Sequence, residues 1–231
     1  MYEVLVRLEG ISPLLQHRFA GNGNNSTSKK KNSKAIAGEV DYSEEWRSTC
    51  YVNNLQEVYI PSAHLEGALV KAAVQFKIKG KRGKTFKDLC RAAVFVDPAT
   101  IPYSDGNGGT LKLPKEPPVI ENGEGCDAPV YVDERDAVVQ RSRIIRNRLA
   151  VNTGWRAQFG LQVADDGIPI DTMQQIMTEA GLRVGIGDYR PRFGRFRVVR
   201  FEEVSDNDKV AWRDTSTGQY RVAQAEEESD N

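Results

Sequence analysis

Two arginine-rich segments carry the clearest chemical signal in this sequence. Residues 137–163 hold five arginines and no acid, and residues 181–201 hold six arginines and a single acid, Asp188. Neither segment contains lysine. Guanidinium groups form paired hydrogen bonds with phosphates and stack on bases, whereas a surface that only keeps a protein soluble usually includes lysine as well. The two segments therefore predict a surface that binds phosphates. The candidate arginines are Arg141, Arg143, Arg146, Arg148, Arg156, Arg190, Arg192 and Arg195.

The second of these segments also contains a glycine-rich loop. Glycines at 185, 187 and 194 permit positive φ angles and let a backbone come close to a ligand. Tyr189 lies among the loop arginines and Trp155 precedes Arg156, so both aromatic rings are candidates for stacking on a base. This pattern predicts a loop that contacts a nucleic-acid backbone. An ordinary surface turn is the alternative interpretation.

Two matches to nucleotide-binding motifs fail in their context. Gly83-Lys84-Thr85 resembles the end of a phosphate-binding P-loop, but Ile78 occupies the position of the required first glycine. Gly185-Ile186-Gly187 resembles a dinucleotide-binding fingerprint, but Arg190 replaces its third glycine and a strand follows instead of a helix. We therefore exclude both nucleotide sites.

Residues that could catalyse a reaction or bind a metal are few. The chain has two histidines, His17 and His64, and three widely separated cysteines that form no Cys-x-x-Cys pair. This composition disfavours a zinc site and a disulfide framework, and we expect no metal or cofactor. His64 falls in the first turn of a predicted helix, where packing is the ordinary explanation for it.

Hydrophobic periodicity indicates the elements that must position these residues. Val4, Val6 and Leu8 alternate as in a half-buried strand, and Ser62 and Asp171 are candidate helix N-caps, the latter in a capping box with Gln174. We expect strands over 3–9, 92–97 and 195–204, two strands within 138–163 turning near 152–154, and helices over 62–76 and 171–180. This βαββαβ order predicts an α+β, ferredoxin-like (RRM-like) fold with an antiparallel sheet, two helices on one face and long loop insertions. RNA-recognition motifs bind with the other face of the sheet.

The rest of the chain fits one domain with insertions. We expect a single domain over 1–204, with a flexible insertion at 20–38, a Pro/Gly-rich insertion at 98–136 and a C-terminal extension at 205–231 that ends in a disordered acidic tail. The net charge is zero, but the run 226–230 contains four acids and no base, so residues 1–225 carry +4. No run of 18 apolar residues and no signal-peptide pattern is present, which predicts a cytoplasmic protein without a membrane span.

Two motifs in the sequence resemble those of the RAMP superfamily, the RRM-like subunits of CRISPR effector complexes. Residues 60–69 (Ile-Pro-Ser-Ala-His-Leu-Glu-Gly-Ala-Leu) are similar to the family's first-helix motif, Ile-Pro-Gly-Ser-Ser-Leu-Lys-Gly-Ala-Leu. Ser62 replaces a glycine, and Glu66 replaces a basic residue that would face RNA. Residues 181–198 resemble the family's C-terminal glycine-rich loop, and the resemblance extends in motif order over roughly 60–204.

Within that superfamily, one RRM-like unit with a long insertion looks most like the backbone subunit that coats CRISPR RNA. The resemblance implies sequence-independent binding of the guide RNA backbone, with the 98–136 insertion acting as a thumb. Its implied partners are guide RNA, the complementary target strand, further copies of the chain and other effector subunits. The residues it implies for RNA binding, beyond the arginines, are Ser62, His64, Trp155, Gly185, Gly187 and Tyr189.

Two other functions remain open at this stage. The first is a RAMP-type ribonuclease using His17 or Asp41, because an aspartate in the loop before the first helix cuts target RNA in type III backbone subunits. The second is a RAMP-like nucleic-acid-binding protein from a phage or mobile element outside a CRISPR locus.

Overall fold

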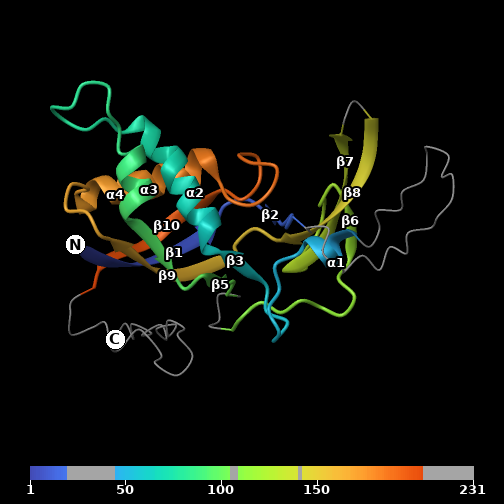
Figure 1. The fold of residues 1–231 in the computed structure, drawn as a ribbon. Coiled ribbons are helices and arrows are strands. Elements are labelled where there is room, and N and C mark those ends of the chain that lie inside the picture. Colours follow the sequence, from blue (N-terminus) through green and yellow to red (C-terminus); the bar gives the residue numbers. More distant parts are fainter. Residues whose placement is uncertain (20–44, 105–108, 140–141, 205–231) are drawn as a thin grey trace, which may run out of the picture.

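The computed structural model describes residues 1–19, 45–104, 109–139 and 142–204. Its first sheet has four antiparallel strands in the order β10-β1-β9-β4. These strands are β10 (Phe196–Glu203), β1 (Tyr2–Gly10), β9 (Arg156–Val163) and β4 (Val94–Asp97). The helices α2 (Ser62–Ala72), α3 (Lys87–Ala93) and α4 (Ile170–Glu179) cover one face of this sheet (Figure 1). With α2 after β1 and α4 after β9, the domain has the βαββαβ order of a ferredoxin-like fold, as predicted.

The central strand β1 shows why the sequence folds in this way. Val4, Val6 and Leu8 are buried on the face toward the helices, so the predicted strand over 3–9 is confirmed. Strand β1 pairs with β10 on one side and with β9 on the other, which satisfies its backbone groups in both directions.

Both long helices form where their apolar stripes predict them, but their starts differ from expectation. Leu65, Ala68, Leu69 and Ala72 are the buried stripe of α2, which continues into a 3₁₀ turn over Ala73–Gln75. The N-caps are Pro61 and Pro169, and neither helix has a side-chain cap. The predicted Ser62 cap and the Asp171–Gln174 capping box are therefore wrong. Each proline has the extended ψ of an N-cap, so each helix begins immediately after its proline and includes these polar residues.

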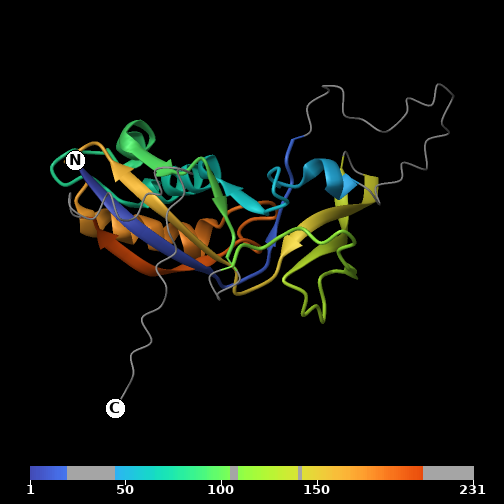
Figure 2. The same cartoon turned by 90° about the horizontal axis from the view of Figure 1, so that it is seen from below.

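A second sheet lies beside the first and is built mainly from strands between β4 and β9 (Figure 1, Figure 2). Its order is β2-β8-β7-β6, and β7 and β8 form a long antiparallel hairpin. Its strands are β2 (Leu14–Leu15), β8 (Ser142–Val151), β7 (Val130–Val139) and β6 (Val119–Glu121). Strands β8 and β9 flank the predicted turn near 152–154, but they belong to different sheets.

The segment 98–136 is more regular than its proline and glycine content indicated. It contains β5 (Thr100–Pro102), which pairs with β3 (Tyr59–Pro61), together with β6 and most of β7. Val130 and Val132 of β7 are buried in the same apolar cluster as the first sheet. Alternating strand residues pack there despite the prolines, because these lie between the strands or at a strand end.

Aromatic side chains pack around Trp155, which lies between β8 of the second sheet and β9 of the first. Trp155 is 2% exposed, lies edge-on to Tyr103 and Phe196, and donates its indole N–H to the carbonyl oxygen of Ser12. A Cβ atom at Gly10 would lie 2.1 Å from the Trp155 ring, so glycine is required there. The remaining α-helix, α1 (Glu45–Thr49), has only five residues. No helix in the described ranges is both long and apolar enough to cross a membrane.

Candidate nucleic-acid interface

The glycine-rich loop 185–194 connects a π-helical turn (Ala180–Val184) to β10 and folds tightly on itself. Gly185, Gly187 and Gly194 have φ angles of 69°, 80° and 70°, which favour glycine. A Cβ at Gly194 would lie 1.7 Å from the Ile186 carbonyl oxygen, and one at Gly187 would lie 2.5 Å from that of Leu15. The glycines therefore let the loop pack against itself and against β2. The predicted close approach of their backbone to a ligand remains a prediction.

Arg148 fixes this loop to the second sheet. Its Nε lies 2.7 Å from an Asp188 carboxylate oxygen, and its guanidinium carbon lies 4.8 Å from the centre of the Tyr189 ring. The Tyr189 hydroxyl donates to the Asp136 carbonyl oxygen at 3.1 Å. Arg148 is 5% exposed and its charge is paired with Asp188 inside the protein, while its contact with RNA stays a prediction. Tyr189 is 36% exposed.

A second arginine supports the loop from β7. Arg135 donates to the buried carboxylate of Asp133 at 2.7 Å, and its guanidinium carbon lies 4.5 Å from the centre of the Phe193 ring. The hydrogen bond to Asp133 raises the pKa of Arg135. The sequence analysis did not identify this pair. The sequence could have predicted it, because Asp133 and Arg135 are two residues apart, and such residues lie on the same face of a strand.

The loop and α2 enclose a cleft of about 220 Å³. The cleft joins the two segments that carry the family resemblance, which are more than a hundred residues apart in the sequence. Two of its side chains, Lys71 and Arg190, are cations, and no carboxylate lines it. The lining residues are Ala63, His64, Gly67, Lys71, Gly187 and Arg190.

His64 is the polar centre of the cleft. Its Nε2 lies 3.4 Å from the hydroxyl oxygen of Tyr51, whose ring packs edge-on against the imidazole. Burial and, secondarily, the nearby charge of Arg190 lower the pKa of His64. The imidazole is therefore neutral at pH 7 and can accept a proton or a hydrogen bond from a ligand.

The acid that replaces the family's basic residue does not face this cleft. Glu66 accepts a hydrogen bond at 3.1 Å from the backbone N–H of Val96 on β4, so its charge points toward the sheet. Ser62 does not line the cleft either: it is half-buried at the start of α2, where its backbone N–H bonds to the Ala99 carbonyl.

The remaining loop arginines lie on the surface. Arg190, Arg192 and Arg195 are exposed, and Arg190 reaches the cleft. The backbone N–H of Arg195 bonds to the Ser12 hydroxyl, which fixes the start of β10. Two exposed guanidinium groups therefore lie on the loop, and a third lies directly after it.

The free face of the first sheet is less suited to phosphate than its arginines suggested. Arg197 lies 2.7 Å from Glu9, which is also 3.7 Å from Arg156. Arg7 donates to the side-chain oxygen of Gln158 at 2.9 Å. Glu9 therefore offsets part of the charge of Arg156 and Arg197, whereas Arg7 bonds to a neutral amide. The cleft, which no carboxylate lines, is the stronger candidate for binding a phosphate.

The other predicted site residues either fall outside the described residues or do not line the cleft. Arg141 and Asp41 fall outside the described residues, and of Arg143 only the position on β8 is described. Arg146 is half-buried on β8, and His17 is exposed and does not line the cleft. Among the described residues, no three His, Cys, Asp or Glu side chains are grouped so that they could hold a metal ion.

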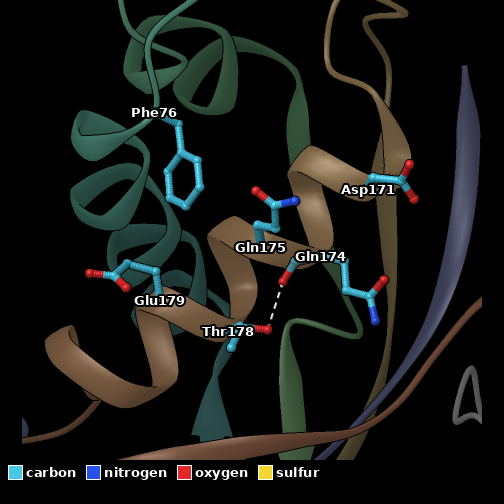
Figure 3. Close-up of a pocket in the computed structure, with 6 residues that line it drawn as sticks. All are labelled: Phe76, Asp171, Gln174, Gln175, Thr178 and Glu179. Atoms are coloured by element: carbon cyan, nitrogen blue, oxygen red, sulfur yellow. Dashed lines mark hydrogen bonds between the residues drawn. The ribbon is translucent and has the colours of Figure 1, made fainter.

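A larger hollow of about 560 Å³ lies on the outer face of the helices (Figure 3). Asp171 and Glu179 are its only charged lining residues, and Thr178 donates to the Gln174 carbonyl at 2.9 Å. Phosphate would be repelled there, so this hollow is a poor RNA site. Its lining is Phe76, Asp171, Gln174, Gln175, Thr178 and Glu179.

Comparison with known proteins supports the fold. No family model and no curated protein matches the sequence. Among solved structures, the chain is similar to one chain in the cryo-EM structure of the Type III-B Cmr-beta bound to cognate target RNA. The TM-score is 0.51 at 14% sequence identity, and the match covers 88% of this chain and 61% of that chain. At that identity the likeness concerns the fold alone, and this chain spans about three fifths of the other's length.

Proposed function

We propose that the chain binds the backbone of single-stranded RNA in the cleft between α2 and the glycine-rich loop, without reading the sequence. The observation that carries this proposal is the cleft's lining, which combines Lys71, Arg190 and a neutral His64 with no carboxylate. Cations without base-specific partners position a backbone but do not select bases.

The floor of the cleft also supports this proposal. A Cβ atom added at Gly67 would meet no atom within 4 Å, so packing inside the protein does not require glycine there. Glycine in the middle of a helix costs about 1 kcal/mol relative to alanine. A glycine that lowers helix stability and has open space above it is expected where the backbone of a ligand must approach the helix closely.

We further propose that the chain is a repeating subunit of a CRISPR effector ribonucleoprotein that coats guide RNA. The motif resemblance over 60–69 and 181–198 and the fold likeness to a chain of an RNA-bound Cmr-beta structure support this assembly. In that setting the 98–136 insertion, which includes most of β7 in the second sheet beside the first (Figure 1), takes the role of the thumb. Further copies and the target strand are the partners.

A binding titration tests the cleft. Arg190→Ala should weaken binding of a labelled, unstructured RNA in fluorescence anisotropy and reduce the log–log salt slope by about 0.7, the value for one phosphate contact on a single strand. Arg183→Ala is the matched control, because Arg183 is also exposed but pairs with Glu179 outside the cleft. Equal effects of the two changes would contradict the proposed site.

Sequencing the RNA that co-purifies with the chain tests the assembly. Guides of uniform length derived from repeats are expected. RNA of mixed origin and length would instead favour a nucleic-acid-binding protein outside a CRISPR locus.

A second candidate function, RNA cleavage without a metal, is favoured by the side chains around His64. The neutral imidazole would remove the proton from a ribose 2′-hydroxyl, whose oxygen would then attack the adjacent phosphorus. The 5′-oxygen of the next nucleotide would leave and take a proton from the Tyr51 hydroxyl, while Arg190 would stabilise the charge on the phosphate. The proton on His64 returns to Tyr51, and the products are a 2′,3′-cyclic phosphate and a 5′-hydroxyl.

Incubation of RNA with the chain in a chelator tests this candidate. Cleavage that persists in the chelator and is lost in His64→Ala would support it. Loss in His17→Ala instead would assign the activity to that exposed histidine. Cleavage that needs magnesium and is lost in Asp41→Ala would assign it to the predicted aspartate.

A further inference from the structure

A lysine-rich loop follows α2, at the opposite end of the helix from the start of the cleft. This loop, residues 77–86, and the first five residues of α3 together hold seven basic residues and one acid. The backbone of this loop is well defined by hydrogen bonds: Ile78 N–H bonds to the Lys84 carbonyl, and Phe86 N–H bonds to the Phe76 carbonyl. Gly80 and Gly83, with φ angles of 80° and 74°, make its turns. The loop projects from the helical layer (Figure 1).

Apolar anchors hold this loop on the body while its charges face solvent. Phe86 is buried in the main apolar cluster, and Phe76 and Ile78 pack against that cluster. The cations between these anchors are exposed: Lys77, Lys79, Lys81, Arg82 and Lys84. No ion pair joins any of these five to a carboxylate in the part of the chain that the structure describes.

The loop lies on the same helix that forms the floor of the cleft. Helix α2 has eleven residues and is followed by three residues of 3₁₀ turn, so the two ends are about 22 Å apart. Lys71, which lines the cleft, lies between them in the exposed part of α2. The only acid of α2, Glu66, is bonded to Val96, and Glu179 on the neighbouring helix pairs with Arg183 at 3.2 Å.

We propose that the lysine-rich loop is a second phosphate-binding surface, which holds the RNA strand where it continues along α2 beyond the cleft. This inference rests on the proposed function of the cleft. The loop carries mostly lysine, whose ammonium groups act as mobile point charges, whereas the cleft loop carries arginine. Such mobile charges can follow phosphates whose positions vary along the continuing strand. The span of about 22 Å is also comparable with the length of the single-strand grooves of other proteins, which hold 4–16 nucleotides.

RNA fits this surface better than an acidic protein partner does. The cations continue from the cleft through Lys71 to the loop, so one strand bound in the cleft reaches them without leaving the helix. The exposed apolar residue in this region, Val74, stands alone among polar neighbours, so a packed protein interface has little apolar area to use.

The experiment compares two charge-matched double variants of the full chain. Lys79→Ser with Lys81→Ser removes two loop cations, and Lys112→Ser with Lys115→Ser removes two exposed lysines elsewhere. Affinities for oligo(U) of two and twenty nucleotides are measured by anisotropy over a range of salt concentrations. For the twenty-nucleotide RNA, the loop variant should lower the log–log salt slope by about 1.4, which is about 25-fold in affinity at 0.1 M salt.

The expected pattern is a loss for the long RNA only, with the short RNA and the control variant unchanged. An unchanged slope in the loop variant would overturn this inference while the effect of Arg190→Ala keeps the cleft proposal intact. Equal losses for short and long RNA would also overturn it, because the loop would then act on the cleft itself. Altered self-association without a change in RNA affinity would assign the loop to a protein partner. No RNA binding by the unmodified chain would overturn both proposals.

Discussion

Replacing Gly67 with alanine separates the stability of this protein from its proposed function. Gly67 lies in the middle of α2, and an added Cβ would meet no atom within 4 Å. The substitution should therefore stabilise the fold by about 1 kcal/mol, the difference in helix propensity between glycine and alanine. For a chain of 231 residues, a change of this size raises the melting temperature by about 2–4 °C.

The same methyl group should weaken RNA binding if a backbone lies over Gly67. Forcing extra carbon atoms into a filled space typically costs about 1–3 kcal/mol, which corresponds to about 5- to 150-fold in affinity. Gly67→Gln, which adds more bulk and no charge, should bind more weakly still. Thermal unfolding followed by circular dichroism measures the first effect, and anisotropy with labelled oligo(U) measures the second.

Opposite signs for stability and affinity are the signature of this mechanism. Gln174→Ala is the matched control, because Gln174 is an exposed helix residue outside the cleft and its loss should leave the affinity unchanged. If Gly67→Ala stabilises the fold and RNA affinity stays within twofold, no backbone lies over Gly67 and the cleft proposal is wrong. If Gly67→Ala instead destabilises the fold, the space above Gly67 is not open.

Three further predictions concern other contacts. Arg148→Ala should destabilise the fold by about 1–2 kcal/mol in chemical denaturation, because it removes the ion pair with Asp188, whose carboxylate stays partly solvated, and it should also weaken RNA binding. Trp155→Phe should cost about 1–3 kcal/mol through the lost indole bond to Ser12 and incomplete packing, without changing the RNA affinity of the folded protein. The pKa of His64 is lowered in the folded state, so the unfolded chain binds a proton more readily. The stability of the fold should therefore fall as the pH drops through the unfolded pKa of about 6.5. Between pH 7 and 5, the melting temperature of His64→Gln should fall less than that of the unmodified protein.

Periodic patterns within single elements were readable without the tertiary structure. The alternation of Val4, Val6 and Leu8 and the stripe Leu65, Ala68, Leu69 and Ala72 depend only on strand and helix geometry, so their elements formed where predicted. The second sheet was less visible. Strand β6 has three residues, and a parallel pairing with β7 depends on contacts that no local pattern encodes.

The role of each arginine could not be read from its residue type. Arg148 and Arg190 looked alike as members of arginine-only segments, yet one is buried against Asp188 and the other lines an open cleft. Trp155 was a candidate for stacking on a base because it precedes Arg156, but it is buried between β8 and β9. Burial depends on which distant segments pack nearby, and the sequence contains that information only through the whole fold.

By itself, the sequence determined the order of the elements of the first sheet, the arginine and glycine content of one loop, and the apolar stripes that place two helices on that sheet. These properties follow from the local geometry of strands and helices and from side-chain chemistry. Only the tertiary structure decided that residues 60–69 and the loop 185–194 meet in one cleft, that Glu66 turns toward Val96, and that the space over Gly67 stays open. These are outcomes of packing between segments far apart in the chain, where small differences in distance decide whether a charge faces a partner or solvent.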